Sequence, residues 1–185
     1  AYNPANTQEL YVGTGEGWYN SDAISGLGIW KSSDGGNSWA QLSSTNSSTY
    51  YQIQKIVVTS AGIVYAATRS GGVRRSIDGG NNWTQVLSGR AAAIEIGADG
   101  TLYATIGIFT TDGIYSSTNG TSWTKRNTGT NGFPTSGFER IEIACAPSDP
   151  NVLYALTQHD IDNTIENIYI SSDKGLNWTT VNKPT

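Results

Sequence analysis

The sequence contains a short motif that recurs along the chain and ends each time on a tryptophan. Residues 32–39 read SSDGGNSW, residues 76–83 read SIDGGNNW, and residues 171–178 read SSDKGLNW. A degraded copy, SSTNGTSW, covers residues 116–123. Self-similarity at a spacing of roughly 40–55 residues indicates a repeated supersecondary unit, each copy of which needs a neighbour to bury its apolar face.

Every copy of the motif is surrounded by the same short segments. An aromatic-bearing apolar stretch lies upstream, a short segment leads into the motif, and a few strand-forming residues follow the tryptophan. A further apolar stretch comes first in the three later copies. No stretch has a sustained helical period, and segments of about five residues are typical of strands. Each repeat is therefore predicted to be one four-stranded antiparallel sheet.

Each residue type in the motif has a structural task. Glycine permits the positive φ of a tight turn, and the aspartate and serine oxygens accept bonds from N–H groups of the turn. The tryptophan covers the turn and buries apolar area. We therefore assign a structural, non-catalytic role to Ser32, Asp34, Gly36, Trp39, Ser76, Asp78, Gly80, Trp83, Ser171, Asp173, Gly175 and Trp178.

The degraded third copy is one residue short between Gly113 and Trp123. Either Thr118 replaces the aspartate, or Asn119 takes the capping role after a glycine is lost. The second alternative keeps the strand before the motif in register with the other copies, so it is preferred. The structural set of this copy is then Asn119, Gly120 and Trp123.

The pattern S-x-D-x-G-x-[ST]-W resembles the Asp-box, also called the BNR repeat. This motif is shared by sialidases, xyloglucanase-like glycoside hydrolases, sortilin-type propellers and many secreted propellers. The resemblance implies an all-β fold, a β-propeller with about four four-stranded antiparallel blades. It also implies that ligands bind over the loops between the second and third strands of a blade and between successive blades, opposite the motif turns.

The predicted blades cover the whole chain. Blade 1 is partial, spanning residues 1–43; its first strand is expected to precede residue 1, with residues 1–8 forming only a joint before the second strand. Blades 2, 3 and 4 span residues 50–88, 90–127 and 138–182. About three and three-quarter blades favour a segment of a larger propeller, and a closed four-bladed ring is the alternative.

The composition excludes several kinds of partner. The net charge is −4 and the charges are scattered, which argues against a nucleic-acid partner. No apolar run approaches the roughly 18 residues that a membrane span needs. A single cysteine forms no intramolecular disulfide and no cysteine-based metal site. No cofactor or metal is expected.

The candidate ligand-binding residues lie on the loops of the expected binding face. The longest loop, residues 13–27, carries Trp18, Tyr19 and Asp22, an aromatic and polar set that suits sugar stacking. The alternative is that Trp18 has a structural role and packs on its own loop or on the neighbouring blade. Four loop aromatics, at positions 50, 51, 133 and 138, are similar in kind, and at least two of them should be structural. The remaining candidates are Arg69, Arg90, Phe133, His159 and Asp160.

Two glutamates occupy equivalent positions in first strands. Glu95 lies between Ile94 and Ile96, and Glu142 lies between Ile141 and Ile143. A carboxylate among β-branched residues must be paired or solvated. Arg90 and Arg140 are the expected partners, and a channel-lining role is the alternative.

These observations predict a non-catalytic module of a secreted or cell-surface protein that binds glycan or protein. Its partners would be the rest of its own propeller, another protein or a glycan. No catalytic residue is assigned. One alternative is part of a sialidase-like or xyloglucanase-like glycoside hydrolase with catalytic residues partly outside this chain. The other alternative is a sortilin-like peptide-binding propeller.

Overall fold

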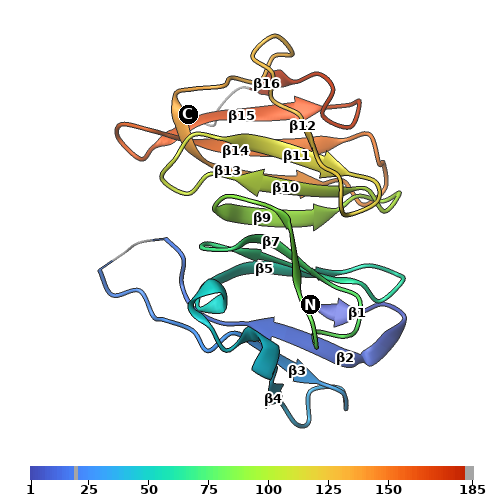
Figure 1. The fold of residues 1–185 in the computed structure, drawn as a ribbon. Coiled ribbons are helices and arrows are strands. Elements are labelled where there is room, and N and C mark those ends of the chain that lie inside the picture. The colour runs from blue at the N-terminus through green and yellow to red at the C-terminus, as the bar shows by residue number, and fades with distance from the viewer. Residues whose placement is uncertain (19–20, 182–185) are drawn as a thin grey trace. The chain divides into compact units, whose positions relative to one another are not determined.

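A computed structural model describes residues 1–18 and 21–181 and shows an all-β architecture of four four-stranded antiparallel sheets (Figure 1). In each sheet the strands follow one another in chain order. The chain forms two compact units, residues 1–94 and 95–185, and strand β9 spans the division. Over the described residues, no helix has the length and apolar character that crossing a membrane requires. The four-stranded repeat predicted from the sequence is confirmed.

Unit 1 contains sheets 1 and 2, joined by a loop with two 3-10 turns, η1 (Ser43–Thr45) and η2 (Ser48–Tyr50). Sheet 1 comprises β1 (Tyr2–Asn3), β2 (Asn6–Gly13), β3 (Ile29–Ser32) and β4 (Ala40–Gln41). Sheet 2 comprises β5 (Ile53–Val58), β6 (Val64–Thr68), β7 (Gly72–Ser76) and β8 (Thr84–Leu87).

Sheets 3 and 4 follow the same plan. Sheet 3 comprises β9 (Ala91–Ile96), β10 (Leu102–Ile106), β11 (Gly113–Ser117) and β12 (Thr124–Lys125). Sheet 4 comprises β13 (Phe138–Cys145), β14 (Leu153–His159), β15 (Ile165–Ser171) and β16 (Thr179–Val181).

The prediction for the start of the chain was wrong in one respect. Residues 1–8 are not only a joint: β1 occupies the first-strand position of sheet 1, and β2 begins at Asn6. Asn3 Oδ1 accepts the backbone N–H of Ala5 at 3.0 Å, which closes a tight turn between the two strands. Ala1 and Tyr11 exchange two backbone bonds, at 2.8 and 2.9 Å, so the chain folds back on β2 immediately.

The core lies between neighbouring sheets within each unit. In unit 1, β2 packs against β5, and the buried cluster contains Tyr11, Ile29, Tyr50, Ile53, Val58, Val64 and Ala66. In unit 2, β10 packs against β13, with Tyr103, Ile114 and Ile141 fully buried. The second strands β6 and β10 are buried at every position, so both of their faces are covered.

The repeated turn at the start of each final strand is held by its own side chains. Ser32 Oγ donates to Asp34 Oδ1 at 2.7 Å and accepts the N–H of Gly36 at 2.9 Å. Asp34 also accepts the backbone and side chain of Ser38, at 2.9 and 2.6 Å. These donors lower the pKa of Asp34 from its ordinary 3.8 to about 2, with Ser38 the largest cause. The turns around Asp78 and Asp173 have the same bonds.

The third turn keeps this arrangement with an amide in place of the carboxylate. Asn119 Oδ1 accepts the N–H groups of Thr121 and Ser122, at 3.0 and 2.9 Å. Ser117 is one residue nearer to the turn glycine and the tryptophan than the serine of the other copies. It donates to Asn119 at 3.1 Å and accepts the N–H of Gly120 at 2.8 Å. The structure therefore places Asn119, and not Thr118, at the capping position.

Candidate functional site

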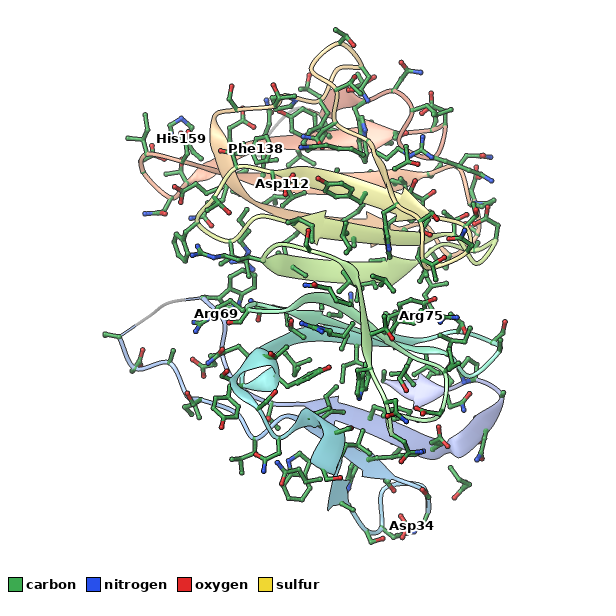
Figure 2. All side chains as sticks on the ribbon, in the orientation of Figure 1. Asp34, Arg69, Arg75, Asp112, Phe138 and His159 are labelled. Carbon is green, nitrogen blue, oxygen red and sulfur yellow. The ribbon has the colours of Figure 1, made fainter. Side chains whose placement is uncertain are left out.

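The loops that the sequence singles out in unit 1 are joined at the end of the sheets opposite the repeated turns. The β2–β3 loop and the loop between sheets 1 and 2 are linked by a bond from Gly26 N to the carbonyl of Tyr51 at 2.7 Å. Ile53 N donates to Thr14 O at 3.1 Å. A Cβ at Gly15, whose φ is +88°, would lie 1.9 Å from the same Tyr51 oxygen, so the contact depends on glycine. These two loops form one surface, and Figure 2 shows Asp34 in the turn at the other end of sheet 1.

The candidates of this surface differ in exposure. Trp18 is half-buried and Asp22 is exposed, whereas Tyr19 lies outside the described residues. Arg69 is half-buried in the loop between β6 and β7, and its backbone N–H donates to the backbone carbonyl of Gln52 at 3.1 Å. The loop that carries Trp18 is thus connected through residues 51–53 to the loop that carries Arg69. Arg90 is half-buried and precedes β9.

Phe133, which the sequence analysis counted among the ligand-binding candidates, lies in the core of unit 2 and not on an exposed loop surface. Its side chain is only 1% exposed. Its ring centroid lies 4.4 Å from that of Tyr169, 5.2 Å from that of Trp178 and 5.9 Å from that of Phe138. The loop can fold inward because position 132 is a glycine: a Cβ there would lie 2.0 Å from the backbone carbonyl oxygen of Trp178. Phe138 and Tyr50 are also buried, in keeping with the expectation that at least two of the four loop aromatics are structural.

His159 and Asp160 belong to the β14–β15 hairpin of unit 2, which Figure 2 shows extending from sheet 4. His159 Nδ1 lies 3.1 Å from Asp162 Oδ1, and the same oxygen accepts the N–H and hydroxyl of Thr164, at 3.1 and 2.8 Å. The bonds from Thr164 are the largest cause of a lowered pKa at Asp162. Asp160 is exposed. The hairpin is thus organised by Asp162, and no cluster of three or more His, Cys, Asp or Glu residues suited to a metal ion occurs among the described residues.

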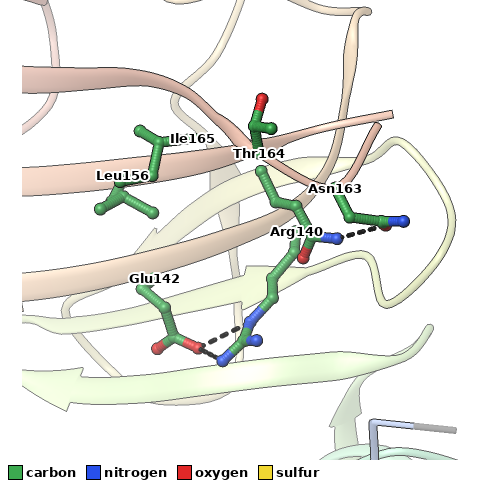
Figure 3. Close-up of a pocket in the computed structure, with 7 residues that line it drawn as sticks. Arg140, Glu142, Leu156, Asn163, Thr164 and Ile165 are labelled. Carbon is green, nitrogen blue, oxygen red and sulfur yellow. Dashed lines mark hydrogen bonds and ion pairs between the residues drawn. The ribbon is translucent and has the colours of Figure 1, made fainter. Parts of the chain in front are cut away.

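A hollow of about 230 Å³, which we call the sheet 4 hollow, lies on sheet 4 beside this hairpin (Figure 3). Arg140 Nε and Nη2 both donate to Glu142 Oε1, at 3.0 and 2.6 Å, which is one of the pairings expected from the sequence. Sequence reasoning placed the ion pair but not the hollow, because the hairpin residues that complete it carry no recognisable pattern. The lining residues are Arg140, Glu142, Leu156, Gln158, Asn163, Thr164 and Ile165.

An apolar hollow of about 300 Å³ lies on sheet 1. It is lined by Val12, Thr14, Trp30 and Trp39, and we call it the sheet 1 hollow. The sequence analysis assigned Trp39 to the turn and gave Trp30 no ligand role, so it did not anticipate this hollow. The two tryptophans meet there because Trp30 lies on β3 and Trp39 closes the turn that follows it.

The turn carboxylates already accept several donors each, and Glu142 is neutralised by Arg140. The loop surface of unit 1 offers an aromatic side chain and a carboxylate, the sheet 4 hollow offers amides and an ion pair, and the sheet 1 hollow offers indole rings.

Solved structures similar to this chain are propellers or parts of larger proteins. A GH74 enzyme from Niastella koreensis gives a TM-score of 0.70 at 22% identity, covering 97% of this chain and 28% of that one. The GH74 xyloglucanase from Xanthomonas campestris gives 0.72 at 21% identity, covering 98% and 29%. The extracellular domain of a proposed one-component system from B. thetaiotaomicron gives 0.56 at 12% identity, covering 97% and 21%. At these identities the likeness concerns the fold, and the chain spans less than a third of each of these proteins.

No curated protein matches the sequence. The family model of the DUF6242 beta propeller domain matches residues 8–149, which is most of the chain and includes three of the four repeated turns. Together with the four consecutive four-stranded antiparallel sheets, this match shows that the chain belongs to the DUF6242 β-propeller domain family.

Proposed function

We propose that this chain is a non-catalytic binding module of a secreted or cell-surface protein, and that the loop surface of unit 1 binds glycan. The observation that carries the proposal is the hydrogen-bonded connection of the two loops, with Gly26 bonded to Tyr51 and Ile53 to Thr14, on either side of the segment that contains Trp18. An aromatic side chain on a fixed loop is suited to stacking on a sugar ring, and the neighbouring Asp22 can accept bonds from sugar hydroxyls.

Two further features support this proposal. The bonds in the repeated turns, with a serine hydroxyl and an aspartate sharing the turn's N–H groups, agree with an assignment as Asp-box (BNR) turns that hold a sheet together. One similar structure is an extracellular domain, which supports a location outside the cell. Protein binding at the same loops is the alternative occupant.

A role as part of a glycoside hydrolase is the competing function, because the two GH74 enzymes have TM-scores of 0.70 and 0.72 with this chain. Both functions are tested with xyloglucan oligosaccharides and a wider glycan array. The binding proposal expects saturable binding without release of new reducing ends. Because the catalytic residues of the competing enzyme would lie partly outside this chain, hydrolysis is assayed with the full-length protein, and sustained hydrolysis there would establish the enzyme instead.

The location of the site is tested with Trp18→Ala. We expect at least about tenfold weaker glycan binding, because stacking and burial of an indole contribute on the order of 1.4 kcal/mol or more. Leu27→Ala is the matched control, since Leu27 is 58% exposed on the same loop. Glycan binding that survives Trp18→Ala unchanged would remove the proposed site.

A further inference from the structure

The loop between β10 and β11 holds a phenylalanine in a backbone conformation that its side chain disfavours. Phe109 has a φ of 53°, in the left-handed region, and its side chain is 42% exposed. In this region a Cβ meets the following carbonyl oxygen, so glycine is the usual residue there, and asparagine or aspartate is the usual exception. A bulky aromatic residue with this φ is an outlier that calls for a functional explanation.

The other described residues with a positive φ that are not glycine each have a local reason for it. Asn163, with a φ of 59°, is of a type that tolerates the left-handed region. Lys174, with a φ of 60°, stands at the turn position that Gly35 and Gly79 hold in sheets 1 and 2, where φ is 71° and 69°. Phe109 is neither an asparagine nor part of a repeated turn, so neither reason applies to it.

Both sides of this loop are anchored to the neighbouring strand β13. Ile108 is 1% exposed and forms an isolated antiparallel bridge with Arg140. Thr111 Oγ1 donates to the backbone carbonyl of Phe138 at 2.7 Å. The exposed ring therefore stands between two fixed points of the chain. Sheet 3 is also an interior repeat, so this exposure is not that of a terminal sheet.

The surroundings of the ring on its loop are polar. Thr110 and Thr111 are exposed, and Asp112 is half-buried. Asp112 Oδ1 accepts the hydroxyl of Tyr115 at 2.8 Å and the ammonium of Lys125 at 2.9 Å, so its charge is compensated. A protein-binding hot spot is instead surrounded by packed contacts that exclude water. A single ring bordered by hydroxyls suits a ligand that has one apolar face and a polar edge.

We infer that Phe109 is the stacking residue of a second glycan-binding site, on unit 2, for a neutral pyranose whose C–H bonds share one face, such as β-linked glucose. The ring covers that face, and the exposed Thr110 bonds the hydroxyls at the sugar's edge. The anchored loop holds the ring in place before the ligand arrives, which lowers the ordering cost of binding. The ligand class rests on the function proposed above, whereas the site is separate from that of Trp18.

The test titrates the full chain with cellotetraose and with xyloglucan oligosaccharide, and follows the backbone amide resonances of Thr110 and Thr111. We expect saturable shifts of both resonances. Phe109→Trp keeps an aromatic ring and should retain them. Phe109→Asn removes the ring and should weaken the apparent affinity at these resonances by at least about tenfold, because stacking is lost.

Thermal unfolding of the same variant separates binding from packing. Asparagine tolerates the left-handed region, so Phe109→Asn should leave the unfolding midpoint unchanged or raise it while binding is lost. Ile161→Asn is the matched control, since it removes an apolar side chain that is 83% exposed on the β14–β15 hairpin. This control should leave the shifts of the Thr110 and Thr111 resonances intact.

Several results would overturn the inference. A lowered unfolding midpoint in Phe109→Asn would assign the ring to packing, and undiminished affinity in that variant would exclude the ring as the contact. Equal shifts with an uncharged leucine-containing peptide would make a protein the ligand. Shifts confined to the unit 1 loops and removed by Trp18→Ala would leave the proposed function standing without this second site. Shifts at Thr110 that Trp18→Ala leaves intact would support the second site by itself, and no shift anywhere in the chain would overturn both.

Discussion

Replacement of Phe133 by alanine distinguishes a core residue from a ligand-binding one. The ring is 1% exposed and contacts three other aromatic side chains, of Phe138, Tyr169 and Trp178. If its role is packing, Phe133→Ala should lower the free energy of unfolding of unit 2. If its role is ligand contact, stability should hardly change and binding should be lost.

The expected cost follows from the size of the buried group. Loss of a fully buried phenylalanine ring, including the cavity that remains, costs about 3–5 kcal/mol. Phe133→Leu retains much of the volume but loses the aromatic pair contacts, each worth about 0.5–1.5 kcal/mol, so it should cost roughly 1–2 kcal/mol. The order wild type, leucine, alanine is therefore the expected order of stability.

Denaturant unfolding followed by tryptophan fluorescence measures these differences, because Trp178 packs edge-on against the ring at 5.2 Å and reports on the same interface. Leu176→Ala is the control, since Leu176 is 55% exposed on the adjacent turn and should change stability by less than about 0.5 kcal/mol. A loss of less than about 1 kcal/mol for Phe133→Ala would refute the assignment of this ring to the core.

Two further predictions concern the turns and loops. Hydrogen bonds led by those from Asn82 hold the folded-state pKa of Asp78 at about 2, below its ordinary 3.8, so the stability it contributes is present above about pH 3.8 and is lost as pH falls toward 2. Asp78→Asn should therefore flatten the acid limb of a stability–pH curve between those values, and an unchanged limb would show that this carboxylate is not responsible. Gly132→Ala should destabilise the chain more than Gly137→Ala in thermal unfolding, although both glycines have positive φ (+83° and +86°), because only the first would place a Cβ against Trp178; equal losses would contradict the close approach.

Most of the fold follows from the sequence because its determinants are local. The serine, aspartate and glycine of each turn bond within five consecutive residues, so the motif can be recognised without knowledge of what surrounds it. The same logic identified Asn119 in the degraded copy. The short first strand was missed because Pro4 cannot donate a ladder bond and the segment around it is typical of a turn.

The candidate site was harder to predict because burial of a loop side chain is not a local property. Phe133 is surrounded in sequence by Gly, Asn, Thr and Pro residues, a composition typical of an exposed loop. What buries it is Trp178, 45 residues further along the chain, whose backbone meets Gly132 and whose ring meets Phe133. The sheet 4 hollow likewise depends on β13 lying beside the β14–β15 hairpin.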